Sequence, residues 1–257
     1  MNVARTVPEL RAALARLQGE TLGLVPTMGA YHAGHVALFG AARSECDAVV
    51  ASLFVNPAQF TEAADFEGYP REESADLRVA EEEGVDLVFA PSVGELYPPG
   101  YQTWVDVEEL SQPLEGAFRP GHFRGVATVC LKLFNLVRPD RAYFGQKDAQ
   151  QVAVVRRMVR DLEVPVEIRV VPTVRDDDGL ALSSRNVLLS PDERRRALAF
   201  PRALATRDAA RARVLLNGLE VDYVEEADLD GMHVLAGAVR VGSVRLIDNV
   251  LLEGEPT

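Results

Sequence analysis

The sequence is poor in cysteine, in long apolar runs and in positive charge. Its two cysteines, Cys46 and Cys130, lie in separate apolar segments without Cys-x-x-Cys spacing, so we expect buried, reduced thiols rather than a disulfide or a metal site. No apolar run approaches the roughly 18 residues that a membrane helix requires. Residues 1–9 contain no apolar signal segment. We therefore expect a cytoplasmic protein without a membrane span.

The deficit of positive charge also restricts the possible partners. The formal net charge is −12, which opposes attraction to nucleic-acid phosphates and anionic lipid surfaces, so we expect neither as a partner. An anionic ligand would have to be held by a few local cations and by helix N-termini. Apolar residues make up 47% of the chain and charged residues 26%, as in ordinary soluble folded proteins.

Strand and helix patterns alternate along the first two thirds of the chain. A first helix follows the capping pattern of Thr6 and Glu9. Apolar spacing predicts strands over 22–25, 48–55, 86–90, 141–144 and 166–171, and helices over 35–46, 74–83, 126–137 and 148–162. This order is typical of an α/β fold with a doubly wound parallel sheet, in which ligands lie at the carboxyl ends of the strands.

The pattern changes after Pro172, which predicts a second, smaller α+β domain. The sequence there contains a polar loop over 175–186, a capped helix start at Ser190, and short strands near 221–224 and 244–251. We therefore place one domain at 1–173 and the second at 174–257, sizes that suit domains of ordinary length.

The loop over 26–35 joins the first predicted strand of the sheet to the next helix, where such folds place nucleotide phosphates. Gly29 and Gly34 let the backbone approach a ligand, and the following helix offers free N–H groups to an anion. His32 and His35 can face one ligand from the same side. Two alternatives are an ordinary polar turn and a metal site, although no nearby residue completes a ligand set at familiar spacing.

Two further junctions follow strand ends. Asn56 and Gln59 can recognise hydroxyl and carboxylate groups, or they can form an Asn-Pro turn with an exposed Gln; the two interpretations have equal weight. Lys147 can neutralise phosphate charge, whereas the alternative is a plain helix start with Asp148 as the N-cap.

Two loops carry arginines. The segment 182–186, with two serines and Arg185, suits a phosphate clamp but resembles many surface loops. The segment 116–125, which holds Arg119 and His122, is either a mobile basic loop over the site or a structural connection or oligomer contact, and we favour a structural role.

Seven segments in this order resemble those of the pantothenate synthetase family, the pantoate–β-alanine ligases. The resemblance spans nearly the whole chain and rests on PTMGAYHAGH at 26–35, FVNPAQF at 54–60, YPR at 69–71, LEGAFRPGHF at 114–123, FGQKDAQQ at 144–151, DGLALSSRN at 178–186 and RLIDN at 245–249.

The resemblance implies a cytoplasmic homodimer with a Rossmann-like N-terminal domain of the nucleotidylyltransferase type and a small C-terminal lid domain. It also implies the reaction. Pantoate and ATP, with Mg²⁺, give pantoyl adenylate and pyrophosphate, and β-alanine then displaces AMP to give pantothenate, a coenzyme A precursor. ATP is expected as a substrate, without a tightly bound organic cofactor.

The resemblance also implies site residues. Those carried over as ATP contacts are Met28, Gly29, Ala30, Tyr31, His32, Ala33, Gly34, His35, Gly145, Gln146, Lys147, Asp148, Val174, Leu182, Ser183, Ser184 and Arg185. Those with catalytic roles are His32, His35, Lys147 and Arg185, and His35 is also implied as a proton donor. Pantoate is assigned to Gln59 and Gln151, and β-alanine to Gln59 and Asn56. Metal ligands are not implied.

Three features depart from the family pattern. Gln146 stands where the family commonly has Glu, Ala149 where it commonly has an aromatic residue, and the region around 206–213 is shorter than usual. Because the first two flank Lys147 without replacing it, we expect activity to survive while lid motion and affinity differ.

Two other functions fit parts of the pattern. One is a nucleotidyltransferase that releases its adenylylated product, which β-alanine-dependent release of AMP would exclude. The other is a non-catalytic nucleotide-binding module. The joint presence of His32, His35, Lys147 and Arg185 argues against that module.

Overall fold

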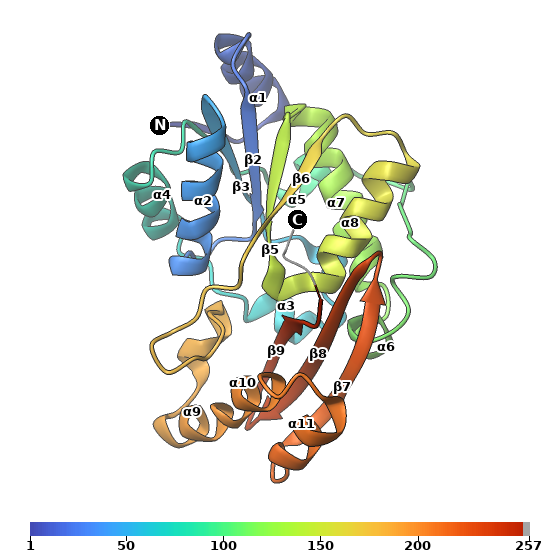
Figure 1. Cartoon of the computed structure of the whole chain (residues 1–257). Coiled ribbons are helices and arrows are strands. Elements are labelled where there is room, and N and C mark those ends of the chain that lie inside the picture. The colour runs from blue at the N-terminus through green and yellow to red at the C-terminus, as the bar shows by residue number, and fades with distance from the viewer. Residues whose placement is uncertain (254–257) are drawn as a thin grey trace.

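The computed structural model describes residues 1–253, and a six-stranded parallel sheet forms its larger part (Figure 1). The strands are β1 (Asn2–Ala4), β2 (Leu22–Thr27), β3 (Ala48–Leu53), β4 (Leu87–Phe89), β5 (Arg141–Gly145) and β6 (Glu167–Val171), in the order β1-β4-β3-β2-β5-β6. All neighbouring pairs are parallel. The predicted doubly wound parallel sheet is thus confirmed, with β1 as an additional edge strand.

Helices cover both faces of this sheet, which explains why its inner strands are continuous apolar runs rather than alternating ones. One face carries α1 (Val7–Leu14), α7 (His122–Val137) and α8 (Ala149–Asp161). The other carries α2 (Ala33–Glu45) and α4 (Glu73–Glu82). The connections contain the short helices α3 (Ala63–Glu67), α5 (Val93–Leu96) and α6 (Glu115–Phe118), and the 3₁₀ turns η1 (Ala15–Leu17), η2 (Pro57–Gln59), η3 (Gln146–Asp148) and η4 (Ser184–Leu188).

A second, antiparallel sheet follows in the C-terminal part. It consists of β7 (Glu220–Leu229), β8 (Met232–Val241) and β9 (Val244–Leu251), preceded by α9 (Pro191–Ala197), α10 (Ala199–Leu204) and α11 (Ala209–Leu215). Phe200 lies in the core between these helices and the sheet. Residues of α8, including Ala149 and Ala153, share an apolar cluster with Tyr223 and Leu229 of β7. The predicted smaller α+β part is therefore present, and it packs on the larger one.

The strand order explains where a ligand site can form. From β2 the chain continues to β3 on one side, whereas β5 pairs with β2 on the other side. The loops that leave β2 and β5 therefore diverge and open a crevice at the carboxyl ends of these strands. In residues 1–253 no helix is both long and apolar enough to cross a membrane. Cys46 and Cys130 are buried and free, as predicted.

Candidate active site

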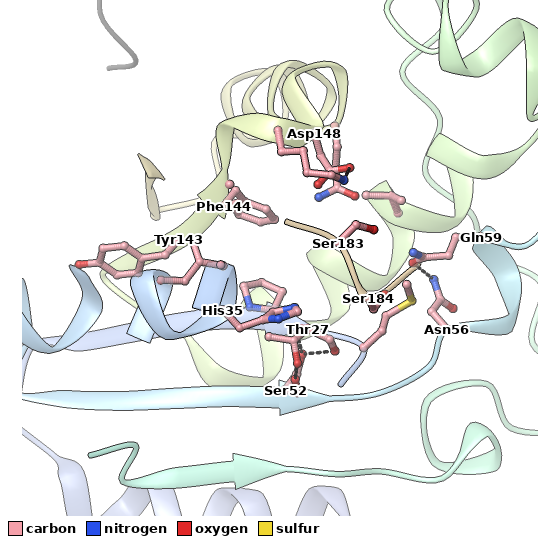
Figure 2. A pocket seen from close by; sticks show the side chains of 18 of the residues that line it. Thr27, His35, Ser52, Asn56, Gln59, Tyr143, Phe144, Asp148, Ser183 and Ser184 are labelled. Carbon is pink, nitrogen blue, oxygen red and sulfur yellow. Dashed lines mark hydrogen bonds and ion pairs between the residues drawn. The ribbon is translucent and has the colours of Figure 1, made fainter. Parts of the chain in front are cut away.

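A cavity of about 250 Å³ lies at this switch point, between the strand ends and the segment that follows β6 (Figure 2). It brings together most of the predicted residues. These are Met28, His32, Gly34, His35, Asn56, Gln59, Gly145, Lys147, Asp148, Gln151, Val174, Leu182, Ser183, Ser184 and Arg185.

The two histidines of the first loop cap helix α2. The Nδ1 atom of His32 accepts from the N–H of Gly34 at 3.1 Å, and the Nδ1 atom of His35 accepts from the N–H of His32 at 3.3 Å. A neutral imidazole that accepts at Nδ1 carries its hydrogen on Nε2. Burial lowers the pKa of His32 and lowers that of His35 to about 3. Both side chains are therefore neutral hydrogen-bond donors at pH 7.

Other predicted residues of this loop do not line the cavity. The carboxylate of Asp76, on α4, accepts from the N–H of Ala30 at 3.0 Å and from that of Tyr31 at 2.8 Å. A Cβ at Gly29, where φ is +85°, would lie 2.7 Å from the same carboxylate. These amides are hydrogen-bonded within the protein and shape the loop, and the ATP contacts predicted for Gly29, Ala30 and Tyr31 stay a prediction. Ala33 also lies outside the lining, in the first turn of α2.

The side chain of Gln59 is buried, which contradicts the alternative of an exposed Gln. Its Oε1 accepts from Nδ2 of Asn56 at 3.0 Å, so its own Nε2 hydrogens are left for the cavity. Asn56 is only 1% exposed and also donates to the carbonyl of Gly125 at 3.1 Å. Its Oδ1 accepts from the N–H of Ala58 at 3.3 Å and from the hydroxyl of Tyr97 at 3.0 Å. Asn56 thus orients Gln59.

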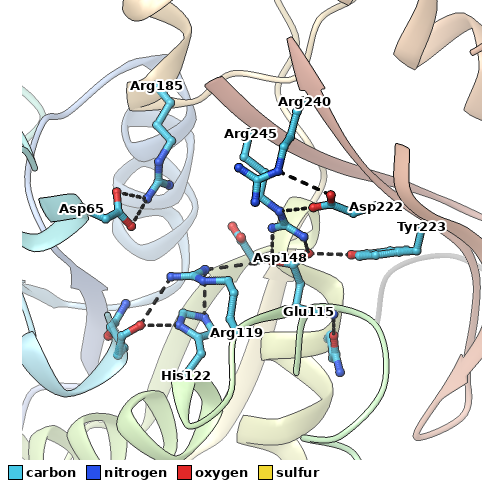
Figure 3. A network of polar contacts seen from close by, with 12 residues as sticks. Asp65, Glu115, Arg119, His122, Asp148, Arg185, Asp222, Tyr223, Arg240 and Arg245 are labelled. Carbon is cyan, nitrogen blue, oxygen red and sulfur yellow. Dashed lines mark hydrogen bonds and ion pairs between the residues drawn. The ribbon is translucent and has the colours of Figure 1, made fainter. Parts of the chain in front are cut away.

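The segment 116–125 also reaches the cavity, where Arg119 and His122 are among the lining residues, and its contacts there support the favoured structural role. Nδ1 of His122 lies 2.7 Å from the carbonyl oxygen of Gln59, and Nη2 of Arg119 donates to that oxygen at 3.4 Å (Figure 3). Burial and the charge of Arg119 lower the pKa of His122 to about 4, so the ring is neutral. Because Nδ1 faces a carbonyl oxygen, which can only accept, the hydrogen of the neutral ring is assigned to Nδ1. Gln59 is therefore fixed at its side chain by Asn56 and at its backbone carbonyl by Arg119 and His122.

The junction between β5 and α8 places Lys147 and Asp148 on the cavity, with Nζ of Lys147 3.7 Å from Oδ1 of Asp148. Asp148 is the N-cap residue of α8, as the alternative interpretation predicted, although its side chain makes no capping hydrogen bond. Gln146, predicted as an ATP contact, points away from the cavity, and its Nε2 donates to Oδ1 of Asn249 at 3.3 Å.

Arg185 also lines the cavity. Its guanidinium pairs with Asp65 of α3 at 3.1 Å (Figure 3). The loop before it is stabilised because Leu182 donates its N–H to the carbonyl of Val174 at 3.0 Å and Ser183 accepts from the N–H of Arg185 at 3.3 Å.

The charge of the cavity opposes that of the whole chain. Arg119, Lys147 and Arg185 line it, whereas Asp148 is its one carboxylate within residues 1–253. The lining of this cavity thus carries more positive than negative side chains in a protein whose net charge is −12. Such a crevice attracts anions locally.

Several lining residues were not predicted. Val126, Val129 and Leu133 of α7 form an apolar wall with Phe54, and Thr27, Ser52 and Tyr69 add hydroxyl groups. Tyr69 belongs to a family motif, but its sequence context gave it no role. The wall residues were predicted only as part of an apolar helix, because periodicity does not distinguish core from lining.

The fold and the site together define the class of protein. A switch-point crevice with imidazole donors at a helix N-terminus, local cations and an apolar wall is the site of an α/β enzyme that takes a nucleotide together with a small anionic molecule.

Comparison with known proteins identifies the family. The model of the family described as pantoate-beta-alanine ligase matches residues 2–251. The chain is 53% identical to the pantothenate synthetase of Roseiflexus sp. (strain RS-1), over 98% of this chain and 100% of that protein. The pantothenate synthetase structure from Thermus thermophilus superposes with a TM-score of 0.94 at 46% identity, covering 99% of this chain and 100% of that one.

A second solved structure is the pantoate-beta-alanine ligase of Francisella tularensis in complex with beta-gamma ATP and beta-alanine. It has a TM-score of 0.89 at 34% identity and covers 100% of both chains. The chain belongs to the pantoate–β-alanine ligase family, as the sequence motifs predicted. It is accordingly a ligase that condenses pantoate with β-alanine, uses ATP through a pantoyl-adenylate intermediate, and releases AMP and pyrophosphate.

Proposed function

We propose that the switch-point cavity is where pantoyl adenylate forms and where β-alanine then displaces AMP. The observation that carries this proposal is the convergence of the two neutral imidazoles, His32 and His35, with Lys147 and Arg185 on one cavity of a strongly acidic chain. The Francisella relative, solved with beta-gamma ATP and beta-alanine, supports the same ligands here.

The geometry suits attack of a carboxylate on the α-phosphorus of ATP. Negative charge grows on phosphate oxygens in the transition state, and preorganised donors and cations stabilise it. Nε2 of His32 and of His35 supply N–H donors, while Lys147 and Arg185 supply charge. Burial lowers the pKa of His35 to about 3, so the neutral ring is a hydrogen-bond donor in the free protein, and the role of proton donor implied by the family resemblance stays a prediction.

Pantoate is assigned to Gln59 and Gln151, which line the cavity together with the apolar residues of α7. The Nε2 hydrogens of Gln59 suit a carboxylate or hydroxyl oxygen, and the wall suits the hydrocarbon part of the acid. Gln59 is also the residue that faces β-alanine. Asn56 acts through Gln59 rather than on the amine, because both polar atoms of its side chain are already bonded within the protein.

Mg²⁺ enters with ATP. Within residues 1–253 no cluster of three or more His, Cys, Asp or Glu side chains is arranged for a metal, and Asp148 is the carboxylate that the cavity offers. This fits an ion held mainly by nucleotide phosphates with one protein carboxylate, and bound Mg²⁺ would neutralise phosphate charge. We also propose, from the family resemblance, that the chain is a cytoplasmic homodimer.

The test follows products with each substrate omitted in turn. Purified protein with ATP, Mg²⁺, pantoate and β-alanine should yield AMP and pantothenate, and sustained AMP release should require β-alanine. We expect His35→Ala and Lys147→Ala each to slow adenylate formation by about 10²-fold or more, as loss of a transition-state contact can.

The matched control is His233→Ala, because His233 lies on β8 away from the cavity. It should keep the parent rate. Rates within a few-fold of the parent for His35→Ala or Lys147→Ala would remove that residue from the site, and no pantothenate from the parent protein would refute the proposal.

A further inference from the structure

Two successive polar residues of β9, Asp248 and Asn249, are each only 3% exposed. Side chains alternate between the faces of a strand, so adjacent buried polar residues must each be engaged on a different face. Both belong to the segment 245–249, which has no role in the reaction as described so far.

The side-chain amide of Asn249 forms hydrogen bonds with the loop that carries Lys147. Its Nδ2 donates to the backbone carbonyl of Gln146 at 2.9 Å and to that of Lys147 at 3.0 Å. Its Oδ1 accepts from Nε2 of Gln146 at 3.3 Å. The amide therefore bonds the backbone of two successive loop residues and one side chain.

Asn249 is itself held in place. Its backbone N–H donates to Oδ1 of Asp248 at 2.8 Å, and that carboxylate binds Arg175 through Nη1 at 2.7 Å and Nη2 at 3.1 Å. Joining the two parts of the molecule does not require the Asn249 amide, because Arg245 makes two hydrogen bonds to Glu115 of α6. The contacts of Asn249 thus act specifically on the loop over 146–147.

Lysine has a flexible four-carbon side chain, so the position of its ammonium depends on how firmly its backbone is held. Catalytic groups lose effectiveness when they are displaced by about an ångström. We propose that Asn249 is a positioning residue for Lys147, fixing the β5–α8 loop so that the ammonium reaches the phosphates of ATP. This inference rests on the proposed role of Lys147.

A double-mutant cycle tests it, because residues that act through one another are not additive. Asn249→Ala is expected to slow adenylate formation by about tenfold and to raise KM for ATP, while KM for pantoate stays unchanged. In a Lys147→Ala background, the same substitution should change the rate by less than about twofold.

Two further variants separate positioning from a general loss of structure. Asn249→Ser keeps one donor and should lose less rate than Asn249→Ala. Val239→Ala removes a fully buried apolar side chain from β8, on the cluster that faces the helices α9 to α11, so it weakens the same sheet without touching the loop. Below its melting temperature it should keep the parent rate and the parent KM for ATP.

The outcomes distinguish a wrong role for Asn249 from a wrong role for Lys147. Equal losses from Asn249→Ala in both backgrounds, or a loss of the same size in Val239→Ala, would overturn the positioning role. Should Asn249→Ala not fold, the same comparison in both backgrounds is made with Asn249→Ser. A parent-like rate for Lys147→Ala alone would instead refute the proposed function of that lysine, and the inference with it.

Discussion

The charge state of His35 follows from its place in the backbone. Its Nδ1 atom is occupied by an amide hydrogen, and burial, followed by electrostatic interactions with His32 and Lys147, lowers its pKa to about 3. An imidazole is neutral at every pH above its pKa, so His35 keeps its neutral ring, with the hydrogen on Nε2, across the physiological range.

We predict that the rate of adenylate formation has no acid limb from His35 near pH 6.5, the ordinary pKa of histidine. Protonation of His35 would set in only as the pH approaches about 3, so the rate should be level between about pH 8 and 5.5 as far as this residue is concerned. Single-turnover measurements at constant ionic strength would show this.

His35→Gln provides the matched comparison, since its amide can donate a hydrogen bond but does not titrate. It should retain more activity than His35→Ala and show the same pH profile as the parent. An acid limb near pH 6.5 that disappears in His35→Gln would show that His35 titrates and that its neutral role is wrong.

Much of the cavity could be predicted at the level of single residues. His32, Gln59 and Lys147 each follow a strand of one parallel sheet, and such ends necessarily meet at one edge. Asp65 and Asp76 were not foreseen. Asp65 pairs with Arg185, 120 positions away, and Asp76 accepts from the amide of Ala30, 46 positions away. An isolated acidic residue in a helix gives no sign of such a distant contact.

Among the elements, η2 and α7 make an unusually close approach. A Cβ at Gly125 of α7 would lie 2.3 Å from the carbonyl oxygen of Ala58 and 2.7 Å from the backbone nitrogen of Gln59. These are backbone atoms, so a side chain at this position could fit only if η2 moved. The position of Gln59 in the cavity therefore depends on a glycine in a different element.

We predict that Gly125→Ala displaces η2, destabilises the protein by about 1–3 kcal/mol and raises KM for pantoate more than KM for ATP. Overpacking accounts for the loss of stability, and movement of Gln59 accounts for the change in KM. Denaturant unfolding and steady-state kinetics measure the two effects.

Gly40→Ala is the control for Gly125→Ala, because it makes the same substitution in α2, on the opposite face of the sheet from α7. Gly40 lies within α2, and an added Cβ would meet no atom within 4 Å. Alanine favours helix over glycine by roughly 1 kcal/mol, so this variant should be as stable as the parent or more stable, with unchanged kinetics. If the two variants behaved alike, the close approach of α7 to η2 would not matter.

Three strands were missed or predicted too short, and each for a physical reason. β1 has three residues at a sheet edge, too few for a periodic signal. β8 is buried over most of its length on both faces, so it lacks alternation, and the Ala-Gly-Ala sequence at 236–238 interrupts its strand-forming residues. β7 extends beyond its predicted end through acidic residues, where pairing with β8 overrides local propensity.

The whole molecule depends on a buried contact between its two parts. Glu115 of α6 accepts from Arg245 at 2.7 and 2.8 Å and from the hydroxyl of Tyr223 at 2.8 Å (Figure 3). Burial opposes ionisation of Glu115, but hydrogen bonds and the charge of Arg245 outweigh it and lower its pKa. The predicted lid function of 174–257 stays a prediction, and movement of β7–β9 as a body would have to break this contact.

We predict that Glu115→Ala destabilises the protein by about 2–4 kcal/mol, because it removes the buried carboxylate that accepts from Arg245 and Tyr223, while Arg245 keeps Asp222 as a partner at 2.6 Å. The comparison is Glu73→Ala, which removes the exposed pair of Glu73 with Arg5, whose side chains are 47% and 55% exposed. Glu73→Ala should lower the free energy of unfolding by less than about 1 kcal/mol.

Equilibrium unfolding in urea measures both changes. If Glu115→Ala cost no more than Glu73→Ala, the buried network would contribute little to joining the two parts. A sloping or two-step transition in Glu115→Ala alone would mean that the parts unfold separately once the contact is lost.

The hydrogen bonds between Asn249 and the loop of Lys147 have a consequence for folding during synthesis, because the loop is made before its partner. The two residues lie 102 positions apart, and translation at about 5–20 residues per second separates their appearance by roughly 5–20 s. N-terminal units generally fold first, so the parallel sheet can assemble while the carbonyls of its lysine loop still lack their partner. A newly made chain therefore becomes fully active only when its last strand docks.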